Sequence, residues 1–341
     1  MKNKPNPFME ILQDFFDSHM PYSAGFSTNT IQSYKYAFRL LMEYLYTEKG
    51  IPADKITFKL LDYTVISDYL RWLEECRKCS VSTRNQRLAA LSSFAAYAQN
   101  RDFEAAAIFM SSLKRLPKKK QKVKLRTIFT LDEVSVLLRL PDDKKSTGMR
   151  DKVLLNVMYA SGARAQEICD LRVRDIQKQG DTVRMTLMGK GKKARRIMIA
   201  KQCGILLCQY LSCRRLDGKP DSHIFSSQTH EHMTVSCVEG IFKKYIRIAR
   251  QEYPSMFLDP HYSPHTMRHT TATHMLEAGI PIMAIKNFLG HVSLATTQRY
   301  TELSQGTVNR HVREWNEKWF SHQTPIPQKQ SSENRMPDFL M

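Results

Sequence analysis

The sequence predicts a mainly α-helical protein of two domains with one small antiparallel β-sheet. Apolar residues recur at helical spacing through most of the chain, whereas residues 181–200 alternate as a strand, a basic turn and a second strand. A basic segment without periodicity, residues 113–127, separates two helical regions. A length of 341 residues also suggests two domains.

The region before the basic segment, residues 1–112, is expected to form a helical domain. Residues 28–46 open with Thr and Asn, which are good helix caps, and then carry apolar residues at helical spacing: Ile31, Tyr34, Phe38, Leu41 and Leu45. Residues 63–77 and 80–99 predict two further helices. The last of these carries Leu88, Leu91, Ala95 and Ala98 on one face.

Three polar residues, Arg84, Asn85 and Arg87, lie near the start of the predicted helix 80–99. One interpretation is a solvated helix end. The other is contact with phosphates or base edges of a nucleic acid, and the sequence alone does not separate the two.

The basic segment is the densest concentration of charge in the chain. Residues 113–126 contain eight basic residues and no acidic one, including Lys118, Lys119, Lys120 and Lys122. The whole chain has a net charge of +19, from 52 Lys and Arg against 33 Asp and Glu. A basic surface can simply be solvated, but clustered charge favours a polyanionic partner, because neutralising phosphates releases counterions.

The region after the basic segment, residues 128–320, is expected to be the second domain. Thr130 and Glu133 form a capping box that opens a helix. Another helix is expected over 151–160, and the chain then turns at Gly162 into a further one. The hairpin 181–200 follows, and the rest is helical. The polar, proline-containing residues 321–341 are expected to be mobile.

Several classes of protein are excluded or disfavoured. No apolar run is long enough to span a membrane, and the N-terminus lacks a signal-peptide core, which predicts a cytoplasmic protein. The seven cysteines do not match zinc-site spacing, so no metal site is expected. The phosphate-binding P-loop and the zinc-protease helix motif are also absent.

A set of basic and phenolic residues remains: Arg164, Lys190, His265, Arg268, His291 and Tyr300. Each residue could also have an ordinary structural role. Arg164 could form an ion pair, Lys190 could be a solvated lysine in a hairpin, and Tyr300 could be a core tyrosine. Together they suit one reaction. Two arginines can hold the non-bridging oxygens of a phosphodiester, a tyrosine can attack it, and histidine and lysine can move protons.

The chain resembles the tyrosine recombinase (phage integrase) family, most closely its Xer-type and simple integrase members. The matching strings, in the family's order, are YASGARAQEICDL, MGKGKKARRI, HTMRHTTATHMLEAGIP and IKNFLGHVSLATTQRYT, within about residues 150–302. Residues 28–100 resemble the family's core-binding helical domain. The family's usual LRHSFATH reads MRHTTATH here, which keeps the His and the Arg.

The resemblance implies a two-domain DNA clamp that performs site-specific strand exchange without metal, ATP or other cofactor. Tyr300 would attack the phosphate and form a 3′-phosphotyrosyl link, while Arg164 and Arg268 clamp the non-bridging oxygens. His265 would accept the proton, His291 would donate a hydrogen bond to the phosphate, and Lys190 would be the general acid. Glu167 would orient Arg164.

Two other functions stay open at this point: a DNA-binding accessory subunit, and a type IB topoisomerase-like enzyme that nicks and reseals as a monomer. The first is disfavoured because all six candidate residues are present. The apolar face of residues 306–320 distinguishes a recombinase from the topoisomerase-like enzyme, because a face this apolar predicts a helix that docks on a neighbouring protomer. The expected assembly is a tetramer in the synapse on double-stranded DNA. The DNA site and the genetic element served are not predictable from the sequence.

Overall fold

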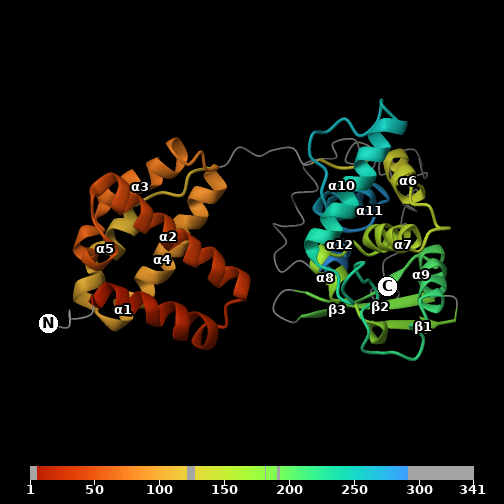
Figure 1. The fold of residues 1–341 in the computed structure, drawn as a ribbon, viewed down its shortest axis with the longest axis horizontal. Helices are drawn as coiled ribbons and strands as arrows, with labels where there is room; N and C mark the ends of the chain where they lie inside the picture. The colour runs from red at the N-terminus through yellow and green to blue at the C-terminus, as the bar shows by residue number, and fades with distance from the viewer. Residues whose placement is uncertain (1–5, 121–126, 181, 190–192, 291–341) are drawn as a thin grey trace, which may run out of the picture. The chain divides into compact units, whose positions relative to one another are not determined.

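The computed structural model describes residues 6–120, 127–180, 182–189 and 193–290 (Figure 1). The chain divides into two compact units, residues 1–124 and 125–341, and the division falls within the predicted basic linker. Both units are mainly helical in their described parts. No helix among the described residues is long and apolar enough to cross a membrane.

The described residues of the first unit form helices and the turns that join them. A π-helical segment, Phe15–Ser23, continues α1, and short 3₁₀ turns at Ala53–Lys55 and Phe58–Leu60 precede α3. The α-helices are α1 Pro7–Asp14, α2 Thr28–Lys49, α3 Tyr63–Glu75, α4 Val81–Arg101 and α5 Phe103–Arg115. The three helices expected from the sequence are therefore confirmed, and α5 extends into the first residues of the predicted linker.

Helix α4 organises the core of the first unit. The ring of Phe94 meets those of Phe8, Phe15 and Phe38 edge to face, with centroids 5.6, 5.4 and 5.1 Å away. Such edge-to-face pairs add to the free energy gained by burying the rings. Three distant parts of the sequence, α1 with the segment that continues it, α2 and α4, thus meet at one side chain.

The second unit combines helices with a three-stranded sheet. Its helices are α6 Leu131–Arg139, α7 Ser146–Ser161, α8 Ala165–Cys169, α9 Lys201–Cys213, α10 Val235–Glu252, α11 Pro264–Glu277 and α12 Ile282–Leu289. A 3₁₀ turn, Val173–Asp175, leads into the sheet. The predicted capping box is confirmed, since Thr130 and Glu133 exchange hydrogen bonds of 2.9 and 3.1 Å between backbone and side chain.

The sheet is antiparallel with the order β1-β2-β3, formed by Ile176–Gln179, Thr182–Met188 and Ala194–Ile199. The pairs Leu187–Arg195 and Met185–Ile197 lie on the same, buried face. Helices α7 and α9 pack against this sheet (Figure 1). The predicted hairpin is confirmed, and β1 adds an edge strand to it.

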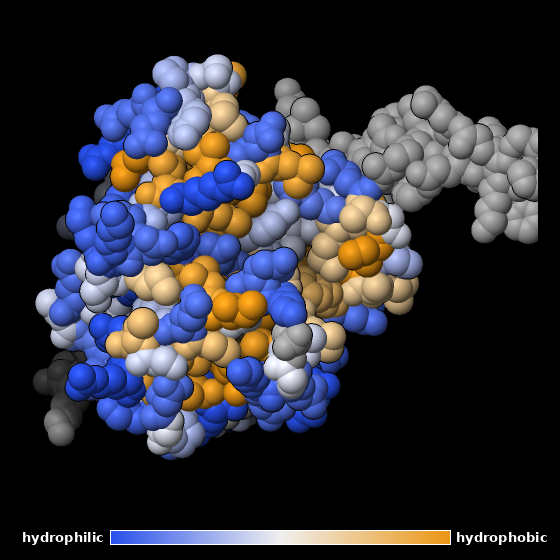
Figure 2. Space-filling model, turned by 90° about the vertical axis from the view of Figure 1, so that its right-hand side faces the viewer, coloured by the Kyte–Doolittle hydropathy of each residue, from blue (hydrophilic) through white to orange (hydrophobic). Residues whose placement is uncertain are grey.

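The exterior of the second unit mixes charged and apolar residues. Figure 2 shows apolar groups gathered in patches between charged ones on the face that it presents. Exposed apolar side chains of this unit include Leu131, Ile205 and Leu258. The described candidate residues of the second unit belong to α8, with Arg164 at its N-cap and Glu167 within it, and to α11, with His265 and Arg268.

Candidate active site

The turn between α7 and α8 carries the first candidate residue. Helix α7 ends at Gly162, whose φ of +56° is a left-handed conformation that favours glycine. A Cβ at this position would lie 2.6 Å from Cδ2 of Leu289, at the end of α12. The turn is therefore packed directly against α12, and it delivers Arg164 to the N-cap of α8.

Glu167 anchors Arg164, as the sequence predicts. Its carboxylate accepts hydrogen bonds from the backbone N–H and from Nη1 of Arg164, both at 2.8 Å. The Glu167 side chain is buried, whereas that of Arg164 is 34% exposed. The guanidinium of Arg164 is therefore bonded to a buried carboxylate, while part of the side chain stays exposed to solvent.

A second arginine, Arg195 of β3, grips the same carboxylate. Its Nη1 and Nη2 donate to Oε1 and Oε2 of Glu167 at 2.7 and 2.8 Å. Burial alone would raise the pKa of Glu167, but the hydrogen bonds and charge of Arg195, with those of Arg164, outweigh it and lower the pKa. Glu167 is therefore ionised at neutral pH.

Arg268 of α11 joins the segments that carry the other candidates. It is 4% exposed, and its Nη1 and Nη2 donate to the carbonyl oxygens of Gly162 and Leu289 at 2.6 and 2.7 Å. One guanidinium thus ties the turn before Arg164 to the last residue of α12. The same helix carries His265, which is exposed in its first turn, three residues from Arg268 and on the same side.

The remaining catalytic candidates lie outside the described residues. Lys190 falls between β2 and β3, where the N–H of Gly189 donates to the carbonyl of Lys193 at 2.9 Å. His291 follows Gly290, which ends α12 with a φ of +68°. Tyr300 lies nine residues further on.

The candidate DNA-binding residues of the first unit make contacts within that unit. Arg84 and Arg87 are buried, at 5% and 9% exposure, so the interpretation as a solvated helix end is wrong for both. Nη1 of Arg84 donates to the carbonyl of Pro117 at 2.8 Å, and Nη1 of Arg87 donates to the carbonyl of Ser33 at 3.2 Å. Burial lowers the pKa of the Arg84 guanidinium, although Glu74 acts in the opposite direction.

Asn85 fixes the start of the basic segment. Its side chain donates to the carbonyl of Lys119 and accepts from the N–H of Lys119, at 2.9 and 3.1 Å. The ammonium of Lys119 lies 2.7 Å from Glu74, while Lys118 and Lys120 are also exposed. Lys122 lies outside the described residues. Together with Arg84, these contacts fasten the first residues of the linker to α4.

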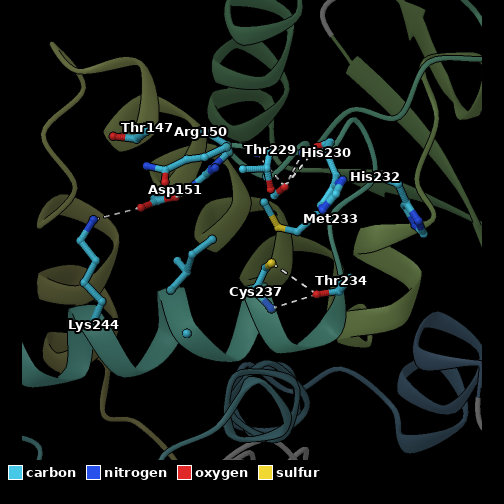
Figure 3. Close-up of a pocket in the computed structure, with 14 residues that line it drawn as sticks. Thr147, Arg150, Asp151, Thr229, His230, His232, Met233, Thr234, Cys237 and Lys244 are labelled. Carbon is cyan, nitrogen blue, oxygen red and sulfur yellow. Dashed lines mark hydrogen bonds and ion pairs between the residues drawn. The ribbon is translucent and has the colours of Figure 1, made fainter.

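A pocket of about 660 Å³ beside α10 is a second concentration of charge (Figure 3). Asp151, which is buried, accepts from Arg150 at 2.7 Å, from Lys244 at 3.2 Å and from Tyr245 at 3.0 Å. One buried carboxylate is thus hydrogen-bonded by two cationic groups and a phenol within the same unit, which is typical of a structural network. Within the described ranges, no group of three or more His, Cys, Asp or Glu side chains is arranged to hold a metal ion.

Sequence reasoning missed Arg195, although a signal for it exists. In the alternating strand 194–199, Arg195 is in phase with Ile197 and Ile199, which face the core. A basic residue in an apolar phase indicates a buried ion pair.

Known families and relatives match most of the chain. Residues 127–306 match the sequence profile of the phage integrase family, and residues 11–114 match that of the phage integrase SAM-like domain. The chain is 30% identical over 299 residues to the tyrosine recombinase XerC of Pelobacter propionicus, covering 87% of this chain and 92% of the relative. It is 29% identical over 286 residues to the tyrosine recombinase XerD of Staphylococcus epidermidis, covering 84% and 92%.

Solved structures share the fold. The XerH site-specific recombinase bound to a palindromic difH substrate, in a post-cleavage complex, superposes with a TM-score of 0.68 at 20% identity, covering 91% of this chain and 88% of that one. The Tn1549 transposon integrase in complex with transposon right end DNA gives a TM-score of 0.67 at 15% identity, covering 89% and 99%.

Proposed function

Because the chain belongs to the phage integrase family and is a site-specific tyrosine recombinase of Xer type, we propose that Tyr300 is its nucleophile. The phenol oxygen of Tyr300 attacks the scissile phosphate, a 3′-phosphotyrosyl bond forms, and the bond to the 5′ oxygen breaks to leave a 5′-hydroxyl. The 5′-hydroxyl of a partner strand then attacks the phosphotyrosine and releases Tyr300. The ester retains the energy of the broken bond, so ATP is not needed. No metal ion is needed because guanidinium groups can stabilise the charge on the phosphate in its place.

We propose that Arg164 and Arg268 bind the non-bridging oxygens, where charge develops in the transition state. His265 accepts the phenol proton, His291 donates a hydrogen bond to the phosphate, and Lys190 protonates the leaving 5′ oxygen. One observation carries this assignment above the others. The hydrogen bonds of Arg268 join the turn before Arg164 to the end of α12, directly before His291.

The functions of a DNA-binding accessory subunit and of a type IB topoisomerase-like enzyme are not favoured. The relatives described above are named as recombinases, and the chain retains every residue that the proposed chemistry uses. An accessory subunit would bind DNA without forming a covalent bond. A nicking and resealing enzyme would relax supercoils without exchanging partners.

The proposed function is tested on a supercoiled plasmid that carries two copies of the DNA flanking the gene. In EDTA and without ATP, the protein should produce deletion or inversion products and should also leave a protein–DNA band that survives SDS. Relaxation without recombinants would favour the topoisomerase-like function. Binding without any covalent band would favour the accessory one.

The protein acts on double-stranded DNA, and we propose that it does so in the cytoplasm. We also propose that residues 1–112 form a DNA-binding domain, that 113–127 form a linker following the phosphate backbone, and that 128–320 form the catalytic domain. Arg84 and Asn85 support the linker through hydrogen bonds to Pro117 and Lys119, whereas Arg87 bonds to Ser33 of α2. We propose that all three residues border the DNA.

Replacing Lys118, Lys119, Lys120 and Lys122 by Gln should weaken binding to all DNA sequences alike. The slope of log affinity against log salt should fall by up to about 0.9 for each phosphate that the variant no longer neutralises. Lys119→Gln alone should have the smallest effect, because this ammonium already pairs with Glu74. An unchanged slope in the quadruple variant would mean that these charges face bulk water.

We propose that residues 306–320, outside the described residues, form a helix that docks on a neighbouring protomer in a tetrameric synapse. Val308, Val312, Trp315 and Trp319 share one face at helical spacing. Truncation after Gln305, or the paired change Trp315→Ala and Trp319→Ala, should leave binding to a single site intact and abolish synapsis. Wild-type rates of synapsis and recombination in both variants would contradict helix exchange.

A further inference from the structure

Arg195 occupies a position that ordinarily holds an apolar residue. It lies on β3 opposite Leu187, on the sheet face that also buries Ile197, and only 9% of its side chain is exposed. Burying a guanidinium costs free energy unless its charge and its N–H groups are matched. The fork of hydrogen bonds from Nη1 and Nη2 to Glu167 matches the charge and satisfies these two nitrogens, while Nε is buried without a hydrogen-bond partner in the described part of the chain.

Arg164, Glu167 and Arg195 form one hydrogen-bonded cluster. Glu167 Oε1 accepts from the guanidinium groups of both Arg164 and Arg195, and Oε2 accepts from Arg195 and the Arg164 backbone. Two positive charges therefore share one negative charge. Without Arg195, the Glu167 carboxylate would neutralise Arg164 alone, and the fork that fixes the orientation of that carboxylate would be gone.

Arg195 also touches the segment that leads to His291. A Cβ at Gly290 would lie 3.0 Å from Cδ of Arg195 and 3.4 Å from its Nη1. The stem of Arg195 therefore packs against the backbone of Gly290, while its head holds Glu167. One side chain contacts both the anchor of Arg164 and the residue before His291.

We propose that Arg195 is a positioning residue for strand cleavage: it holds the Glu167 carboxylate so that Arg164 stays oriented toward the phosphate with its charge available. This proposal rests on the proposed function of Arg164. It assigns to Arg195 no contact with DNA.

The test uses Arg195→Gln with Arg196→Gln as the matched control. Arg196 is the next residue on β3, pairs with Thr186 and is exposed on the other face, so both variants remove one positive charge from the same strand. At saturating DNA, single-turnover cleavage should fall roughly 10- to 100-fold in Arg195→Gln, the usual range for a supporting partner of a reactive group, and stay near wild type in Arg196→Gln. DNA affinity should be similar in both variants. Arg195→Lys should recover part of the rate, because an ammonium keeps the charge but lacks the planar fork.

A double-mutant cycle separates positioning from general stability. If Arg195 acts through Glu167, the reduction in rate caused by Arg195→Gln should largely disappear in a Glu167→Gln background. A reduction of the same size in both backgrounds would overturn the proposal, as would equal rates for Arg195→Gln and Arg196→Gln.

A second readout needs no cleavage. The Arg164 backbone N–H donates to Glu167, so its hydrogen exchange should be faster in Arg195→Gln than in Arg196→Gln, in protein without DNA. Equal exchange would overturn the proposal even if wild-type protein cuts no DNA. Failure of the proposed function shows instead as absence of the covalent band with wild-type protein.

Discussion

Tyr300→Phe should bind its DNA site with wild-type affinity and form no covalent complex. The change removes one oxygen, which is the proposed nucleophile, and keeps the ring, so folding and DNA contacts should be retained. The measurement is the fraction of labelled DNA that migrates with the protein in SDS, and it should fall below detection.

Tyr253→Phe is the matched control for that experiment. Tyr253 is an exposed tyrosine at the end of α10, and losing its oxygen should leave the covalent fraction unchanged. A covalent band of normal intensity with Tyr300→Phe would show that another residue is the nucleophile.

Arg268→Ala should abolish cleavage and also destabilise the second unit. The carbonyls of Gly162 and Leu289 are each deprived of a buried hydrogen bond, and an unsatisfied buried acceptor costs about 1–3 kcal/mol. The melting temperature should fall, and the single-turnover cleavage rate should fall by roughly 10²- to 10³-fold or more, because the phosphate is no longer stabilised.

Asp151→Asn separates the two effects of Arg268→Ala. Asp151 is buried and bonded to Arg150, Lys244 and Tyr245, away from the candidate active site, so removing its charge should destabilise the same unit. Below its melting temperature this variant should still cleave. If Arg268→Ala cleaves as fast as Asp151→Asn when both are folded, the role of Arg268 is structural only.

Much of the fold follows from local sequence signals. The cap at Thr130, the glycine that ends α7 and the alternation in β2 and β3 are all short-range patterns, and each element forms where its pattern predicts. Strand β1, with the sequence IQKQ, is not predictable in this way because only its first residue is apolar. It forms because β2 offers it an edge with which to pair.

The candidate site is predictable where its residues are close in sequence. Arg164 and Glu167 lie one turn apart, so their contact follows from helix geometry. The bidentate contact of Arg195 joins positions 28 residues apart and depends on the register of β3 against β2. The burial of Arg84 likewise depends on residues 117–119 folding back over α4, which no local pattern indicates.

Mass spectrometry of the trapped covalent complex tests the central claim most directly. After nuclease and trypsin treatment, a nucleotide should remain on the peptide of residues 300–310, in which Tyr300 is the only tyrosine. Fragmentation should place a phosphate on the Tyr300 phenol oxygen, esterified to the 3′ oxygen of the nucleotide. Attachment to another residue, or through a 5′ oxygen, would contradict the account.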